Sequence, residues 1–141
     1  MIVLDSSFLV AYHNTRDAHH AAASRTMRRF LEGEWGRGLL LEYVFLEVVT
    51  VLLARRGLAV TAAVAPLLLQ ASEIEFVPCS DFFVETLEVF RSQRSGNLSF
   101  TDAAIASVAR ARSEGLVASF DTDFRELDGL LVVPDETGVS G

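Results

Sequence analysis

Acidic side chains stand where the chain is expected to leave a strand or enter a helix. Asp5 directly follows the apolar run Met1–Leu4. Asp121 directly follows the apolar run Leu116–Phe120, and Asp102 opens a helical segment. Carboxylate oxygens without histidine or cysteine beside them favour Mg²⁺ or Mn²⁺ over Zn²⁺. The pattern therefore indicates a divalent-metal site, provided that the fold brings these acids together.

A fourth acid, Glu47, lies inside the predicted helix Glu42–Arg56 and has apolar neighbours on both sides. If this helix packs on a sheet, Glu47 is expected to be buried, and a buried carboxylate without a partner is costly. The neighbours at helical spacing, Tyr43 and Thr50, carry no positive charge. Like charges in one crevice also repel each other. We therefore expect these acids to require a bound cation.

Each of the three aspartates also has a structural interpretation, whereas Glu47, inside a helix, is not explained as a cap. Asp5 and Asp121 precede helical segments, where aspartate is a common N-cap. Asp102 completes the pattern Ser99-x-x-Asp102, which resembles a capping box. Taken singly, each position fits a helix cap at least as well as a metal ligand. The combination of acids at several element ends favours the metal site.

Short apolar strands alternate with helical segments along the chain. The predicted strands are Met1–Leu4, Leu39–Leu41, Ile74–Val77, Leu116–Phe120 and Leu130–Val133. The predicted helices are Ser6–Tyr12, Asp17–Leu31, Glu42–Arg56, Thr61–Ala71, Ser80–Arg94 and Thr101–Ser113, with a helical turn at Thr122–Leu127. We expect Gly57 and Gly115 to end helices and Pro66 to kink or divide one.

Apolar strands without alternation fit a parallel sheet that is covered on both faces. The prediction is a single α/β domain over residues 1–141, frayed from about residue 134. It would be a three-layer α/β/α fold with a mostly parallel sheet of about five strands. Sites in such folds lie beyond the carboxyl ends of the strands. If the first and fourth predicted strands are neighbours, Asp5 and Asp121 share one crevice.

The composition excludes several classes of protein. All 12 basic residues are arginines, so mechanisms that need a lysine, such as a P-loop or a Schiff base, are excluded. A phosphatase with Asp5 as nucleophile is disfavoured, since Ser7 stands where a second aspartate is usual. The net charge of −7 argues against tight nucleic-acid binding by bulk charge. One cysteine, no membrane-length apolar run and no signal peptide lead us to expect a cytoplasmic protein with no membrane association.

The segments around the four acids resemble those of the PIN-domain family, specifically the VapC-like toxins of type II toxin–antitoxin pairs. The resemblance covers nearly the whole chain. It rests on Val3-Leu4-Asp5-Ser6-Ser7, Leu46-Glu47-Val48-Val49, Phe100-Thr101-Asp102-Ala103-Ala104-Ile105-Ala106 and Ser119-Phe120-Asp121-Thr122-Asp123-Phe124. Ser119 departs from the more usual threonine but keeps the hydroxyl.

The resemblance implies a toxin that is an endoribonuclease, hydrolysing RNA phosphodiester bonds with metal-activated water. It implies 5′-phosphate and 3′-hydroxyl products. It assigns catalysis and the binding of Mg²⁺ or Mn²⁺ to Asp5, Glu47, Asp102 and Asp121. Ser7 and Ser119 would support the metal ligands by hydrogen bonds, and Asp123 would be a peripheral acid.

The resemblance also implies partners. A cognate antitoxin would cover the acidic crevice with its C-terminal segment, and the chain would form a homodimer. Arg55 and Arg56 are candidate contacts for RNA phosphates, although an exposed pair that favours the helix C-terminus is at least as good an explanation. The alternative function is a catalytically silent PIN-like binding or scaffold protein. It would be expected to lack one or more of the four acids, and all four are present.

Overall fold

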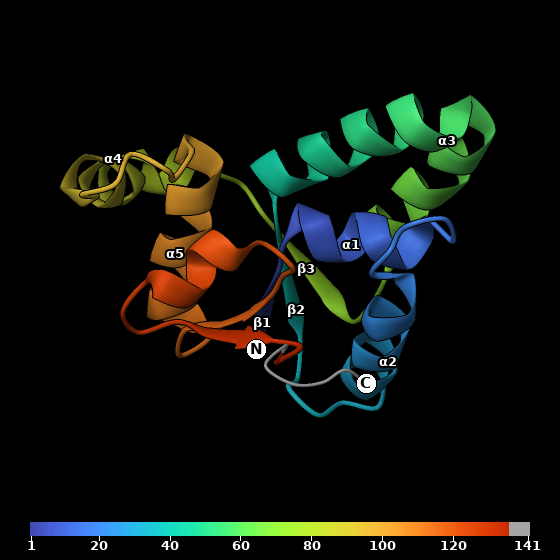
Figure 1. Ribbon diagram of the computed structural model, residues 1–141, viewed down its shortest axis with the longest axis horizontal. Helices are drawn as coiled ribbons and strands as arrows, with labels where there is room; N and C mark the ends of the chain where they lie inside the picture. Colours follow the sequence, from blue (N-terminus) through green and yellow to red (C-terminus); the bar gives the residue numbers. More distant parts are fainter. Residues whose placement is uncertain (136–141) are drawn as a thin grey trace.

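Five short strands form one parallel sheet in the computed structural model, which describes residues 1–135 (Figure 1). The strands are β1 (Ile2–Leu4), β2 (Gly38–Leu41), β3 (Ile74–Val77), β4 (Leu116–Ala118) and β5 (Leu131–Val133). Their spatial order is β3-β2-β1-β4-β5, and every pairing is parallel. The predicted parallel sheet is confirmed, as is the adjacency of the first and fourth strands.

Helices cover both faces of this sheet. They are α1 (Ser6–His13), α2 (His20–Leu31), α3 (Glu42–Gln70), α4 (Phe83–Ser92) and α5 (Phe100–Arg112), with 3₁₀ turns η1 (Ser80–Phe82) and η2 (Thr122–Glu126). In Figure 1, α1 and α2 lie on one side of the sheet, and α4 and α5 lie on the other. The three-layer α/β/α prediction is confirmed.

Several element bounds differ from the prediction. Helix α2 begins at His20 because Asp17 does not cap it directly; Asp17 Oδ1 instead accepts a hydrogen bond of 2.8 Å from the His19 N–H. Strand β4 ends at Ala118, so Ser119 and Phe120 separate it from Asp121. The segment predicted as a helix from Ser80 to Arg94 is η1 followed by the shorter α4. Of the predicted tail, residues 136–141 lie outside the described residues.

Helix α3 is long and apolar enough, by length and composition, to cross a membrane. Gly57 has φ 83° and ψ 178°, so it breaks the helix into two arms, each shorter than the about 20 residues of a span. Side chains of the first arm, including Val44 and Val48, are fully buried in the core. The predicted stop at Gly57 is confirmed, but the helix resumes at once and Pro66 does not divide it. Only 22% of the apolar window of α3 is buried, so this bent helix packs one face on the core and exposes the rest.

The core explains why the sheet forms. All side chains of β1 and β2 are buried, as expected for central strands covered on both faces. Small residues of α5, from Ala103 to Ala106, are also fully buried, and their size lets this helix approach the sheet closely. The sheet edge from which α1 and α3 start is therefore held by a rigid, close-packed centre.

Gly115 connects α5 to β4 in a conformation that other residues rarely adopt. Its φ is +86°, and its N–H donates to the Ala109 carbonyl at 2.9 Å, which ends α5 as predicted. A Cβ added at this position would lie 1.8 Å from the Gly129 carbonyl oxygen. Backbone there must move before any side chain fits.

We expect Gly115→Ala to destabilise the protein by about 2–5 kcal/mol, since backbone strain and overpacking act together. Gly33→Ala is the matched control, because Gly33 has φ +90° but nothing within 4 Å of an added Cβ. It should cost only about 1–2 kcal/mol. Guanidinium unfolding midpoints check both values. Equal losses for the two variants would contradict the role assigned to the Gly129 contact.

Candidate active site

The four acids lie on segments that begin at the carboxyl edge of the sheet. Asp5 follows β1, and its N–H donates to the Ala118 carbonyl of β4 at 3.0 Å, so the ends of these two strands are adjacent. Asp121 follows β4 at the start of η2. Glu47 lies near the start of α3, directly after β2, and Asp102 lies in the first turn of α5. The topology thus brings together four segments far apart in sequence.

Asp5 is the most buried of the four, with only 4% of its surface exposed. It occupies the N-cap position of α1, but its side chain makes no capping hydrogen bond, so the cap interpretation is wrong for this residue. Its Oδ2 instead accepts hydrogen bonds from Ser119 Oγ at 2.6 Å and Ser7 Oγ at 2.8 Å. No cation pairs with it among residues 1–135.

The directions of these hydrogen bonds are fixed by backbone donors. The Phe120 N–H donates to Ser7 Oγ, and the Asp121 N–H donates to Ser119 Oγ, both at 2.9 Å. Each hydroxyl therefore accepts from the backbone and directs its own hydrogen toward Asp5. Asp5 Oδ2 therefore accepts two hydrogen bonds, an arrangement that suits an ionised carboxylate. The predicted support by Ser7 and Ser119 has this geometric basis.

Glu47 is exposed, so the expectation that it would be buried is wrong. Val44, Val48 and Leu52 recur at four-residue spacing and form the buried face of α3. Glu47, one residue before Val48, is turned about 100° away from that face. Its Oε1 accepts a hydrogen bond of 2.8 Å from Ser6 Oγ, which ties it to α1 beside Asp5. The sequence carries no spacing signal for this pairing, because the two residues are 41 positions apart.

Asp102 and Asp121 do have the structural roles that their positions indicate. Asp102 and Ser99 form a reciprocal capping box, in which Asp102 Oδ2 accepts from the Ser99 N–H at 3.1 Å. Asp121 caps η2, since its Oδ1 accepts from the Asp123 N–H at 2.9 Å. Each cap uses one carboxylate oxygen and leaves the other for a ligand. Asp123 takes part through its backbone.

Electrostatic repulsion links the four carboxylates. Burial raises the pKa of Asp5; hydrogen bonds from Ser119 and Ser7 oppose this shift, and the Glu47 charge adds to it. Burial also raises the pKa of Asp102, opposed by the Ser99 N–H and reinforced by the charges of Asp121 and Asp5. Each acid therefore interacts with at least one other acid. Without a cation, the site disfavours its own ionised form.

The acids are close but do not form a ready-made cage. Within residues 1–135, no three Asp, Glu, His or Cys side chains are gathered closely enough to hold one ion. The bonds from Glu47 to Ser6 and from Asp102 to Ser99 hold these carboxylates in separate places, and mutual repulsion favours that separation. Ligation of one ion by several of these acids stays a prediction.

Comparison with known proteins places this geometry in a family. The sequence model described as the PIN domain matches residues 2–130. VapC20 of Mycobacterium tuberculosis, a toxin that cleaves the sarcin–ricin loop, has a similar structure: TM-score 0.77 and 25% identity over 89% of this chain and 93% of VapC20. No curated protein sequence matches significantly.

Two toxin–antitoxin complexes share the fold at lower identity. The complex from Klebsiella pneumoniae gives a TM-score of 0.64 and 16% identity over 93% of this chain and 96% of the other. VapBC2 of Rickettsia felis, bound to promoter DNA, gives 0.60 and 16% over 94% and 97%. Since the family match spans almost the whole chain and the fold agrees with VapC toxins, this chain belongs to the PIN-domain family.

Proposed function

We propose that this protein is a metal-dependent endoribonuclease and the toxin of a toxin–antitoxin pair. Membership of the PIN-domain family and the likeness to the RNA-cleaving toxin VapC20 support this class of activity. The observation that carries the proposal is Asp5. Burial and the charge of Glu47 both disfavour the ionised form of Asp5, and the two serine hydrogen bonds offset only part of this cost. A cation bound beside Asp5 would remove the remainder.

The residues present fit a hard divalent ion. Asp5, Glu47, Asp102 and Asp121 supply only oxygen donors, as Mg²⁺ or Mn²⁺ prefers. The caps at Asp102 and Asp121 each occupy one oxygen, so each residue keeps a second one for the ion. We propose that these four side chains hold the metal directly or through water.

A bound ion supplies stabilisation of phosphate charge and a water of lowered pKa. Ser7 and Ser119 fix the orientation of Asp5, which preorganises the site. Glu47 is exposed and its Oε1 accepts from Ser6 Oγ, so its other oxygen is available to orient the attacking water and to accept its proton. Addition of this water to phosphorus would break the bond to the 3′ oxygen, which would take up a proton from solvent, so the products would be a 5′-phosphate and a 3′-hydroxyl. No 2′-hydroxyl takes part, so RNA must be selected by binding.

Exposed apolar side chains support the proposed protein partners. They lie mainly on α3 and α4 and include Leu46, Leu53, Phe83, Val84, Leu87 and Phe90. Apolar surface of this kind marks protein interfaces. We propose a homodimer and a cognate antitoxin in the cytoplasm, the latter covering the acidic site. Light scattering should give twice the chain mass of 15.4 kDa, and a cognate antitoxin, if a neighbouring gene encodes one, should abolish cleavage when it is added.

Asp5→Asn and Asp102→Asn should each reduce Mg²⁺-dependent RNA cleavage by about 100-fold or more, because a ligand charge is lost while the fold is kept. The measurement is the mapping of new 5′-phosphate ends in cellular RNA after induction. Asp81→Asn, which removes an exposed charge in η1, is the matched control and should cleave normally. Full cleavage by Asp5→Asn would refute the assignment of Asp5, whereas absence of cleavage by the wild type would favour the silent scaffold alternative.

Asp5→Asn should also raise the melting temperature of the metal-free protein at pH 7. Burial raises the pKa of Asp5, so the folded state binds the proton of this carboxyl more tightly than the unfolded state does. The stability that this provides is present at acid pH and is lost as the pH rises through the pKa of Asp5 in the folded protein. Asparagine stays neutral, and each kcal/mol gained raises the melting temperature by roughly 3–6 °C. The difference should vanish at acid pH, and Mg²⁺ should stabilise only the wild type. An equal effect of Mg²⁺ on both proteins would argue against metal binding at Asp5.

A further inference from the structure

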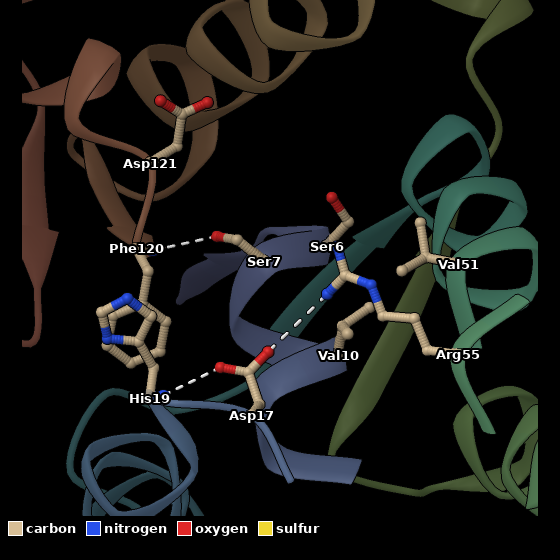
Figure 2. A pocket seen from close by; sticks show the side chains of 9 residues that line it. All are labelled: Ser6, Ser7, Val10, Asp17, His19, Val51, Arg55, Phe120 and Asp121. Atoms are coloured by element: carbon tan, nitrogen blue, oxygen red, sulfur yellow. Dashed lines mark hydrogen bonds and ion pairs between the residues drawn. The ribbon is translucent and has the colours of Figure 1, made fainter. Parts of the chain in front are cut away.

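A pocket of about 400 Å³ opens directly beside the acid site (Figure 2). Ser6, Ser7 and Asp121 line both places, so a ligand in the pocket would touch the site where the phosphate is expected. The volume falls within the range of pockets that hold small organic groups. The remaining wall comes from the loop before α2, from α3 and from Phe120; the residues used below are Asp17, His19, Arg55 and Phe120.

One wall of the pocket is an aromatic stack. The rings of His19 and Phe120 lie 4.3 Å apart between centroids and are tilted by only 11°. Figure 2 shows the two rings superposed at the edge of the pocket, across from Arg55. Phe120 is half-buried and covers one face of the imidazole, whereas His19 is exposed. Because His19 is exposed and lines the pocket, its ring is accessible to a further flat group.

The stack is fixed to the same hydroxyl that holds Asp5. The Phe120 N–H donates to Ser7 Oγ at 2.9 Å, and Ser7 Oγ donates to Asp5. The Phe120 ring also packs against the buried Phe8 ring at 6.5 Å. The aromatic wall thus has a fixed position relative to the acids. A flat ligand stacked on His19 would be held in register with the reacting phosphate.

The opposite wall carries a weakly held cation. Arg55 Nη1 lies 3.8 Å from Asp17 Oδ2, which is long for a salt bridge, and the Arg55 side chain is 58% exposed. Arg56 differs, because it is half-buried and its Nη1 donates to Asn14 Oδ1 at 3.0 Å. Of the two arginines considered from the sequence, only Arg55 lines the pocket.

An open aromatic face, an available guanidinium and an adjacent phosphodiesterase site match one ligand chemistry. Single-stranded RNA is recognised by stacking its unpaired bases on aromatic rings and pairing its phosphates with arginine. We propose that this pocket holds the unpaired nucleotide next to the cleaved phosphate, with its base on His19 and its flanking phosphate at Arg55. This inference rests on the proposed function, because it assumes that RNA is the substrate. It predicts a preference for loops and single strands over duplex RNA.

The test measures RNA binding, which separates it from cleavage. All variants are made in the full chain with Asp102→Asn, so that the RNA stays intact. The probe is short, fluorescein-labelled, single-stranded RNA of randomised sequence, and the readout is the dissociation constant from fluorescence anisotropy in Mg²⁺. Cleavage by the wild type tests the proposed function independently.

His19→Ala should weaken binding about tenfold, since loss of base stacking on an aromatic ring weakens binding by roughly 5- to 150-fold per base. His19→Phe keeps a stacking face and should stay within about threefold of the parent. Arg55→Gln should weaken binding and reduce the slope against log salt by about 0.7, as for one lost phosphate contact on a single strand. Arg28→Gln, an exposed arginine on α2 outside the pocket, is the matched control and should bind like the parent.

Two results would overturn the inference. One is parental affinity in both His19→Ala and Arg55→Gln, which would leave the pocket without a role in binding. The other is an equal loss in Arg28→Gln and Arg55→Gln, which would show that only net charge matters. Either result is compatible with RNA cleavage by the wild type, so the inference can fail while the proposed function stands.

Discussion

The buried carboxylate of Asp5 is the constraint on which the site depends. It lies at the end of the central strand β1, where close packing excludes water, and two serine hydroxyls hold it as an acceptor. Both hydroxyls are in turn fixed by backbone N–H groups of the segment after β4. The pairing of β1 with β4 therefore sets the orientation of Asp5. Burial raises the pKa of Asp5, so ionising this carboxyl without a cation lowers stability, and perturbed groups of this kind are typical of functional sites.

Most of the fold was predictable from local pattern. Short apolar strands such as Leu39–Leu41 carry no alternation, and this alone indicates a parallel sheet covered on both faces. Glycine at the end of α5 marked the helix stop, because only that residue tolerates the backbone conformation at Gly115. The bounds were less predictable where tertiary contacts decide them. Strand β4 ends at Ala118, although Ser119 and Phe120 extend the apolar run that leads to Asp121.

The proposed members of the site follow from sequence position, whereas the geometry among them does not. Acids that follow strands or open helices meet at one edge by topology, so Asp5, Asp102 and Asp121 could be assigned from position. Glu47 was assigned for a wrong physical reason. Its apolar neighbours suggested burial, but the buried face of α3 is set by Val44 and Val48, and Glu47 lies off that face. Its partner, Ser6, follows from how α1 and α3 pack, which spacing along the chain does not encode.

The three consecutive residues Ser119, Phe120 and Asp121 show how one segment can serve both chemistry and recognition. The Ser119 hydroxyl donates to Asp5, and the Phe120 ring stacks on His19. The charge of Asp121 helps to raise the pKa of Asp102. Because the Phe120 and Asp121 N–H groups both bind the hydroxyls that hold Asp5, a shift of the ring would alter the bonds to the acid. The position of the aromatic stack and the orientation of the Asp5 carboxylate therefore depend on the same short stretch of backbone. In the proposed ribonuclease, a poorly stacked base would therefore bind weakly and would also misalign Asp5, and both effects would favour selective cleavage.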